Sequence, residues 1–311
     1  MPFHFTCPYC YKKTLVDDAL AGKSGLCAGC AKSIVIPEAP SQDPENMTPV
    51  GSEYVAKAEN NQTRRYLTYV MQGVVLLVLI GVTTAVVTYF LWPTFNQLRD
   101  RRNKTACLNN LQLIAAALNE YSSKYGTYPP SIVYDDTGKP MHSWRVLILP
   151  ELGYPALYDN YDFNTPWDSE HNANFMMQCP EEYISPAADN HTGNEGTYFL
   201  ITGKGTIFPK GAPLGQKEIT DGRHNTLLVV ESENSVGEWT KPQDIEFAKL
   251  NRQIGAQGAN AIGGNHNKGA TAVMADGTPV WLPDDLDPVL LDAMISPAAK
   301  DEIDVSPVIV Q

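Results

Sequence analysis

Four cysteines near the N-terminus have the spacing of a metal site. They form two Cys-x2-Cys pairs, Cys7 with Cys10 and Cys27 with Cys30. Two such pairs supply the four-sulfur tetrahedral ligand set that zinc prefers. Residues 1–37, the N-terminal module, are too few to be stable through core burial alone, so we expect one structural zinc ion to fold them. A redox pair or two disulfides are the alternatives, but redox chemistry needs only one pair.

A second group of candidate residues surrounds a histidine near the C-terminus. His266 precedes Asp276 and Gly277 in a His-x9-Asp-Gly pattern, and two short β-rich runs flank the Asp-Gly pair. Asp-Gly readily forms a two-residue type I′ turn, which is a structural explanation for Asp276. The functional alternative is a cation or ligand site formed by His266, Glu231, Asp221 and Asp276. Carboxylate ligands favour a calcium-like ion there.

The remaining reactive residues give little indication of catalysis. The sequence contains no G-x-S-x-G, H-E-x-x-H or P-loop pattern, and its histidines lack metal-ligand spacing. Cys107 and Cys179 could form a disulfide in an oxidising compartment, or stay as two buried thiols. The aromatic residues of 143–168 are typical of packing over a sheet, with a sugar-binding groove or a protein-contact surface as alternatives. We therefore predict that the protein is not an enzyme.

One uncharged segment determines the architecture. No charged residue occurs between Arg65 and Arg99, and residues 66–92 are long enough to cross a hydrocarbon core of about 30 Å as a helix. Tyrosine and tryptophan at its two ends match the aromatic belts of a membrane. We predict a transmembrane helix over 66–92, with the lipid bilayer as a partner. Residues 38–65 are polar and rich in Pro and Asn, which indicates a disordered linker.

The chain beyond the span, residues 93–311, is predicted to form one α+β domain. One apolar helical stripe comprises Cys107, Leu111, Ile114, Leu118, Tyr121 and Tyr125. Gly126 and the prolines after it end this helix. Short β-rich runs follow at 197–202, 225–232, 270–275 and 278–283. A long helix packed on an antiparallel sheet accounts for these patterns.

The charge distribution argues against nucleic acid as a partner. Residues 93–311, the C-terminal domain, contain 16 Lys/Arg and 28 Asp/Glu, within a total net charge of −12. An acidic domain of this kind repels phosphate. The N-terminal module has an excess of only two positive charges, so a nucleic-acid-binding ribbon is the weaker alternative.

Five blocks of the C-terminal domain resemble, in order, a large planctomycete family. They read "TACLNNLQLIAAALNEYSSKYGTYPPS", "SWRVLILPELGYPALYDNYDFNTPWD", "QCPEE", "ITDGRHNTLLVVESE" and "GGNHNKGATAVMADGTPVWLPDDLD". Members of that family are pilin-like proteins with a domain of unknown function and a C-terminal His-x9-Asp-Gly motif, once grouped with solute-binding proteins. The resemblance spans about residues 94–294. It implies a membrane-spanning helix whose continuation packs on a sheet outside the cytoplasm.

Two departures from such relatives bear on function. The N-terminal module resembles the zinc ribbon of planctomycete envelope proteins, but Tyr11 and Ala31 stand where a glycine commonly follows each Cys-x2-Cys pair. The segment before the span lacks the Gly-Phe-Thr-Leu-Ile-Glu type of cleavage site. The resemblance therefore implies a permanently anchored relative, not a processed subunit that polymerises.

Zinc thiolates require a reducing compartment, which places the N-terminus in the cytoplasm and the C-terminal domain outside the inner membrane. Three positive charges before the span and four after it favour neither orientation. We expect an interaction or structural component of the cell envelope whose partners are other envelope proteins. The alternative is a C-terminal domain that binds a solute or a cation.

Overall fold

The computed structural model describes residues 2–38, 52–188, 192–232, 237–299, 305, 306 and 308, and gives only the backbone course of residues 52–62. The chain divides into two compact units, residues 1–84 and 85–311.

The N-terminal module contains two small antiparallel hairpins. In the first, β1 (Phe3–Thr6) pairs with β2 (Lys13–Val16), and in the second, β3 (Ser24–Leu26) pairs with β4 (Ser33–Val35). A short 3-10 helix, η1 (Asp18–Leu20), lies between them in the sequence. Each hairpin turn carries one Cys-x2-Cys pair, so the two hairpins present equivalent sulfur atoms.

A long helix includes the predicted span. Helix α1 (Ser52–Val86) is followed by a π-helical turn, η2 (Val87–Leu91), and by α2 (Trp92–Tyr125). Pro93 explains the π turn, because proline has no N–H to donate and its ring clashes with the carbonyl four residues earlier. From Thr63 to Tyr125 the helix contains a window with mean hydropathy 2.5 and no buried side chains.

Helix α1 begins inside the segment predicted as a linker. Residues 39–51 of the predicted linker, 38–65, lie outside the described residues, but from Ser52 onward the backbone is helical. Residues 53–59 include Glu, Ala and Lys, which have high helix propensity. Extending a helix that already exists is far easier than nucleating one, so the span helix continues toward the N-terminus.

The second half of α2 buries one face. Its buried residues are Cys107, Leu108, Leu111, Ile114, Ala115, Ala117, Leu118 and Ser122. The predicted stripe is confirmed up to Leu118, but Tyr125 is 55% exposed. Ser122 occupies the buried face in its place, because a period of 3.6 residues carries position 122 there. Gly126 ends the helix as predicted, with φ 89° and its N–H donating to Ser122 O.

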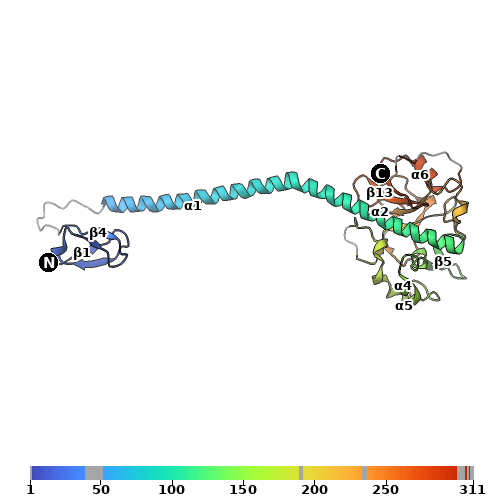
Figure 1. The fold of residues 1–311 in the computed structure, drawn as a ribbon, viewed down its shortest axis with the longest axis horizontal. Helices are drawn as coiled ribbons and strands as arrows, with labels where there is room; N and C mark the ends of the chain where they lie inside the picture. Colours follow the sequence, from blue (N-terminus) through green and yellow to red (C-terminus); the bar gives the residue numbers. More distant parts are fainter. Residues whose placement is uncertain are drawn as a thin grey trace. The chain divides into compact units, whose positions relative to one another are not determined.

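A four-stranded antiparallel sheet confirms the α+β prediction. Its order is β14-β13-β10-β8, formed by β14 (Pro279–Pro283), β13 (Gly269–Met274), β10 (Leu227–Glu231) and β8 (Tyr198–Phe199). Val229 and Val273 belong to the core cluster that contains the α2 stripe. Val230 and Ala272 belong to a second cluster with residues of α6 (Pro288–Ile295). The sheet is therefore covered on both faces, and Figure 1 shows α2 passing close to β13.

Smaller elements complete the C-terminal domain. They are the hairpin β5 (Ile132–Tyr134) with β6 (Pro140–Ser143), the pair β7 (Glu195–Gly196) with β11 (Gly237–Glu238), the parallel pair β9 (Ile201–Thr202) with β12 (Ile245–Glu246), the helices α3 (Trp144–Leu147), α4 (Pro155–Asn160) and α5 (Glu170–Ala173), and the 3-10 turns η3 (Met176–Gln178), η4 (Glu181–Tyr183), η5 (Gln216–Glu218) and η6 (Phe247–Lys249). Trp144 and Tyr161 from the aromatic segment lie in the core, which agrees with the packing interpretation.

Candidate functional site

The four N-terminal cysteines converge. The sulfur atoms of Cys7, Cys10, Cys27 and Cys30 all lie within 4.8 Å of one another. Cys7 Sγ is 3.8 Å from Cys30 Sγ, and Cys10 Sγ is 3.6 Å from Cys27 Sγ. Sulfur ligands about 2.3 Å from a tetrahedral zinc ion are about 3.8 Å apart. The cluster is therefore compatible with zinc.

The two turns that carry these cysteines have the same backbone geometry. The N–H of Tyr11 donates to Cys7 O, and the N–H of Ala31 donates to Cys27 O, both at 2.9 Å. Tyr11 and Ala31 have left-handed φ angles of 59° and 52°. Such a conformation costs a residue other than glycine about 1–2 kcal/mol. The turns therefore form in spite of the two missing glycines.

Electrostatics at the cluster favour a cation. Backbone N–H groups of Gly29 and Cys30 lower the pKa of Cys27 to about 6. The Lys12 N–H also lowers the pKa of Cys10, but desolvation and the three neighbouring sulfurs outweigh it and raise that pKa to about 12. Four adjacent thiolates repel one another unless a cation lies between them.

The C-terminal domain contains a second group of metal-ligating side chains. Cys107 of α2, Glu231 at the end of β10 and His266 in the loop before β13 are buried, and their ligand atoms lie within 4.8 Å of one another. His266 Nε2 is 3.3 Å from Glu231 Oε2, and His266 Nδ1 is 3.5 Å from Asp100 Oδ1. Among the described residues, neither ring nitrogen of His266 has a hydrogen bond. The predicted proximity of Glu231 and His266 is therefore observed.

Hydroxyl and amide groups hold the Glu231 carboxylate in place. Ser185 Oγ donates to Glu231 Oε1 at 2.6 Å and lies 3.1 Å from Cys107 Sγ. The N–H of Thr271 donates to Glu231 Oε2 at 3.2 Å, and its hydroxyl donates to the same oxygen. A Cβ on Gly264 would lie 2.4 Å from the carboxylate carbon of Glu231, so only glycine fits there.

Burial disfavours the charged forms of Glu231 and His266, but interactions with neighbouring side chains favour these charged forms more strongly. Burial would raise the pKa of Glu231, but His266, Ser185 and Thr271 hold that pKa below its usual value. Burial would lower the pKa of His266, but Cys107 and Glu231 raise it to about 10. The cluster therefore favours the protonated, positively charged form of the imidazole.

The two aspartates of the predicted cation site lie in other surroundings. Asp276 Oδ1 accepts a hydrogen bond from the N–H of Thr278 at 2.8 Å. Asp221 Oδ2 accepts one from the N–H of Ala299 at 2.6 Å. In the described part of the chain, neither aspartate belongs to a group of converging ligand atoms. The predicted four-residue, calcium-like set is therefore not brought together: a backbone N–H two residues away engages Asp276, and one from the distant C-terminal segment engages Asp221.

The Asp-Gly turn also differs from its prediction. The N–H of Gly277 donates to Met274 O, the N–H of Met274 donates to Thr278 O, and only Gly277 of the Asp-Gly pair has positive φ. This is a three-residue loop with a glycine bulge, not a two-residue type I′ turn. The aspartate thereby avoids the left-handed conformation that type I′ would impose on it.

Asn119 attaches this turn to helix α2. Its Nδ2 donates to Ala275 O at 3.0 Å, and its Oδ1 accepts from Tyr128 Oη at 2.8 Å and from Arg223 Nη2 at 3.0 Å. Arg223 also donates to Ala275 O. Neither Asn119 nor Arg223 is predicted from the sequence to be a site residue. Their only local signal is that Asn119 follows the buried stripe and Arg223 follows a turn.

Cys107 and Cys179 are free cysteines, so the disulfide considered from the sequence is not formed. Cys107 contacts Ser185 in the interior. The Cys179 thiol donates to Pro180 O at 3.5 Å and packs against the core cluster. Burial raises the pKa of Cys179 to about 12, which leaves it as an unreactive thiol.

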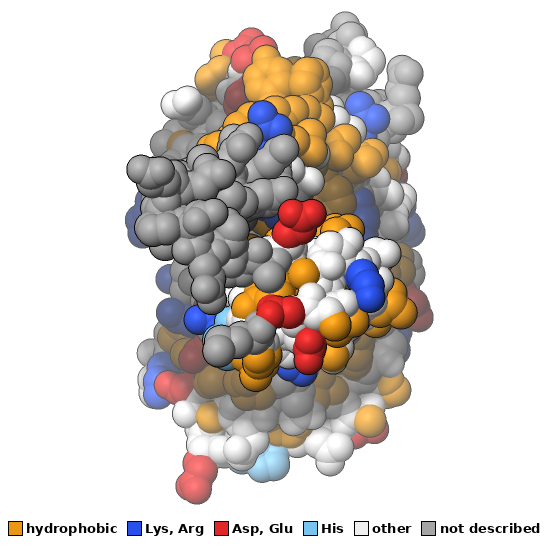
Figure 2. Space-filling model, turned by 90° about the vertical axis from the view of Figure 1, so that its left-hand side faces the viewer, with side chains coloured by type: hydrophobic (Ala, Val, Ile, Leu, Met, Phe, Trp, Pro, Cys, Tyr) orange, Lys and Arg blue, Asp and Glu red, His pale blue; other side chains and the backbone are white. Residues whose placement is uncertain are grey.

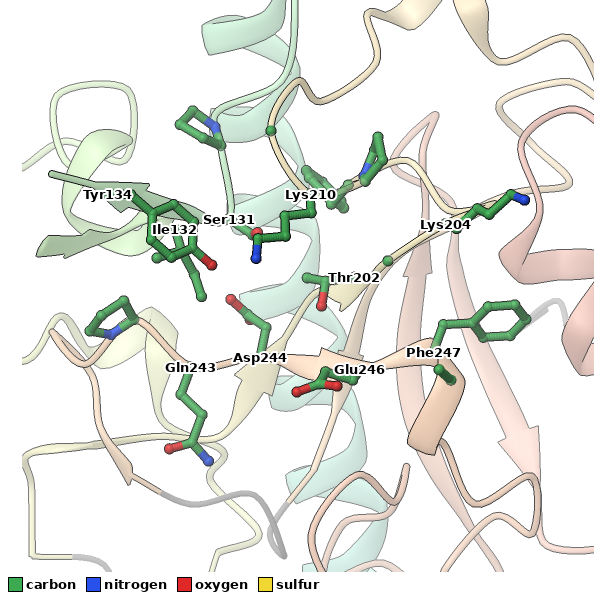
Figure 3. Close-up of a pocket in the computed structure, with 17 residues that line it drawn as sticks. Ser131, Ile132, Tyr134, Thr202, Lys204, Lys210, Gln243, Asp244, Glu246 and Phe247 are labelled. Atoms are coloured by element: carbon green, nitrogen blue, oxygen red, sulfur yellow. The ribbon is translucent and has the colours of Figure 1, made fainter. Parts of the chain in front are cut away.

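Two of the cavities on the described part of the C-terminal domain lie beside candidate residues. One, of about 430 Å³, is lined by His266 and Asp100 together with polar residues of α2. The other, of about 500 Å³, lies beside β5, β9 and β12. Figure 3 shows Tyr134, Lys210 and Asp244 pointing into the same space of this second cavity.

Asp244 in the second cavity belongs to the interior of the fold. Its Oδ1 accepts hydrogen bonds from Trp144 Nε1 and from the N–H of Leu200, and lies 3.5 Å from Arg145 Nη2. Its side chain is 1% exposed. Arg145 in turn donates to Tyr198 O. This buried ion pair could not be predicted from the sequence, because Arg145 and Asp244 are 99 residues apart. We assign no chemistry to the cavity.

Comparison with known proteins gives one family match. No curated protein and no solved structure matches the chain. Residues 100–253 match the model of a family described as "Protein of unknown function (DUF1559)". The matched segment includes Cys107 and Glu231, and His266 lies beyond its end. Residues 100–253 of this chain are therefore similar to a family whose function is unknown.

Proposed function

We propose that this chain is a non-enzymatic, single-pass protein of the inner membrane that joins a zinc-binding module to an extracytoplasmic domain and serves as an interaction or structural component of the envelope. One observation carries the proposal: the helix over the uncharged residues 66–92 leaves its apolar side chains exposed, with Tyr69 at 71% and Leu77 at 69%. In water, each exposed leucine forgoes about 1.5–3 kcal/mol of burial free energy. A bilayer would cover these side chains.

Membrane extraction tests the span. We expect the full chain to stay in the membrane pellet after an alkaline carbonate wash and to dissolve only in detergent. Leu76→Arg with Leu79→Arg places two charges near the centre of the span, which adds about 5–7 kcal/mol to insertion. That double variant should leave the membrane fraction, whereas Leu113→Arg, at an exposed site on α2, should not. Release of the unmodified chain by carbonate would refute the proposal.

Zinc in the N-terminal module is supported by the cysteine geometry and by its electrostatics. The four sulfur atoms would form a closed tetrahedral site with a structural role, because no ligand position is left for a substrate. We expect the isolated membrane protein to lose this zinc in Cys27→Ser and to become protease-sensitive over residues 1–37. Unchanged zinc content and unchanged cleavage would contradict the four-cysteine assignment.

The orientation follows from the same chemistry. Four adjacent thiols in two Cys-x2-Cys pairs escape disulfide formation in a reducing compartment, which supports a cytoplasmic N-terminus. The buried Cys107 of the C-terminal domain has no second cysteine in its cluster, so the same argument does not apply to it. In sealed spheroplasts, external protease should remove the C-terminal domain and leave an epitope at the N-terminus protected. The reverse pattern would refute this orientation.

Nucleic acid binding has less support. On the face drawn in Figure 2, the coloured acidic and basic side chains lie among hydrophobic and uncharged ones. The N-terminal module has an excess of only two positive charges, which gives little attraction for a phosphate backbone. The alternative of a cation-binding C-terminal domain is favoured by one observation, the buried cluster of Cys107, Glu231 and His266.

A further inference from the structure

The buried cluster in the C-terminal domain has the ligand types and the spacing of a metal centre. Cys107, Glu231 and His266 supply one sulfur, one oxygen and one nitrogen atom within 4.8 Å of one another. Nitrogen and oxygen ligands about 2.0–2.1 Å from a tetrahedral ion are about 3.3 Å apart. His266 Nε2 and Glu231 Oε2 are separated by 3.3 Å. This separation is longer than the usual hydrogen-bond distance.

The two ring nitrogens of His266 face carboxylates at ion-pair distances that are long for a hydrogen bond. The side chain is 0% exposed, with Nε2 3.3 Å from Glu231 Oε2 and Nδ1 3.5 Å from Asp100 Oδ1. In the described part of the structure, neither nitrogen meets hydrogen-bond geometry with a partner. An ion bound between Nε2 and Glu231 would account for the long separation of these two atoms.

Neighbouring residues support the three side chains as they do around metal ligands. Ser185 contacts both Glu231 and Cys107, and Thr271 donates twice to Glu231. Hydrogen bonds to the ligands of this kind fix their orientation in metal sites. The ring of Trp281 packs edge-on against His266 with ring centroids 5.7 Å apart. The cluster is thus oriented and shielded from solvent.

The ligand types select the ion. Calcium takes oxygen ligands, whereas a set of one thiolate, one imidazole and one carboxylate suits zinc. The cavity of about 430 Å³ that reaches His266 gives an ion an entry route. Asp100 lines the same cavity, with its Oδ1 3.5 Å from His266 Nδ1.

We infer that Cys107, Glu231 and His266 bind a second zinc ion, distinct from the one proposed for the N-terminal module. The Glu231 carboxylate, the Cys107 sulfur after loss of its thiol proton and one unprotonated ring nitrogen of His266 would hold the ion, so metal binding would release protons to solvent. The inference does not depend on the N-terminal cysteines, because the two clusters share no residue.

Metal counting on the full chain tests the second site. The chain is purified in detergent with zinc supplied, exchanged into metal-free buffer, and analysed for zinc per chain by mass spectrometry. We expect two zinc ions in the unmodified chain and one in Cys10→Ser with Cys27→Ser. His266→Gln should also hold one. Cys179→Ser should keep two, because Cys179 lies outside both clusters.

The outcomes separate the two sites. One zinc in the unmodified chain, falling to none in Cys10→Ser with Cys27→Ser, would overturn the second site and leave the N-terminal one. One zinc that persists in that double variant and disappears in His266→Gln would establish the second site without the first. Two zinc ions retained in His266→Gln would also overturn the inference.

Cobalt binding gives a spectroscopic readout that distinguishes the loss of one ligand from the misfolding of a variant. In the Cys10→Ser, Cys27→Ser background, one bound Co²⁺ should give a sulfur-to-metal charge-transfer band from the single thiolate of Cys107. Adding Cys107→Ser, a nearly isosteric change, should abolish that band. A band that is unchanged by Cys107→Ser would refute this ligand assignment, and so would the absence of any band in the starting background.

Discussion

Replacing Gly264 by alanine tests whether the buried Glu231 carboxylate stands where the structure places it. A Cβ at this position would lie 2.4 Å from the carboxylate carbon and 2.5 and 2.6 Å from its two oxygens. No contact this short can be accommodated, and Glu231 cannot move freely because Ser185 and Thr271 hold it. The substitution must therefore displace either the loop before β13 or the carboxylate.

The expected loss of stability is the sum of two effects. Overpacking a well-filled interior costs about 1–3 kcal/mol. Loosening one hydrogen bond to a charged group adds about 1.5–3 kcal/mol. We expect the free energy of unfolding of the C-terminal domain to fall by about 2.5–6 kcal/mol. For a unit of this size, that corresponds to a melting temperature lower by about 10 °C.

The assay is thermal unfolding of the full chain in detergent, followed by the fluorescence of the buried Trp144 and Trp239. Gly237→Ala is the matched control, because a Cβ there meets only Gln243 and Lys241 at 3.7 Å, an ordinary contact. If Gly264→Ala melts within about 2 °C of this control, the described position of Glu231 against the loop is wrong.

Three other changes probe separate parts of the chain. Tyr11→Gly and Ala31→Gly should each stabilise the N-terminal module by up to about 1 kcal/mol, because glycine readily adopts the left-handed φ that both residues have. Each variant should therefore lose zinc to a chelator more slowly than the unmodified chain, and faster loss would contradict the prediction. Leu118→Ala should destabilise the C-terminal domain by about 2–5 kcal/mol in urea unfolding. Leu113, which is 52% exposed, should tolerate alanine. Equal losses of stability in the two variants would refute the assigned buried face of α2. Burial raises the pKa of Asp244 to about 6, compared with about 3.9 in the unfolded chain. The protonated Asp244 therefore stabilises the folded domain fully below about pH 4, and this stabilisation is lost as pH rises through 6. Asp244→Asn should remove this decrease of about 3 kcal/mol between pH 4 and 7, and an unchanged pH slope would contradict the raised pKa.

Features encoded within one short segment could be predicted from the sequence. The buried face of α2 follows from the spacing of Cys107, Leu111, Ile114 and Leu118, because a helix places these positions on one side. The convergence of the four N-terminal cysteines follows from two matched pairs on two turns. In both cases the relevant residues are positioned by the same or adjacent elements.

Features that depend on distant segments were missed or misassigned. The helical spacing predicts only a core residue or a disulfide partner at Cys107, and the packing of α2 against β10 is what brings it to Glu231. Asp276 and Asp221 were grouped with His266 by residue type, but each carboxylate is engaged by a nearby backbone N–H. Residue type identifies which side chains can bind a metal. It does not identify which of these side chains already accept hydrogen bonds from backbone N–H groups of a turn or of the C-terminal segment.

The spacing of the His-x9-Asp-Gly motif follows from the way β13 runs along helix α2. At one end of the strand, His266 contacts the cluster of Cys107, and at the other end Ala275, beside Asp276, accepts a hydrogen bond from Asn119. Twelve helical steps from Cys107 to Asn119 span about 18 Å. Six extended steps from Gly269 to Ala275 span about 20 Å. The length of β13 therefore matches the distance along α2 between Cys107 and Asn119, and residues 267 and 268 connect His266 to the first residue of the strand. Inserting or deleting one residue within β13 would shift the following side chains to the opposite face.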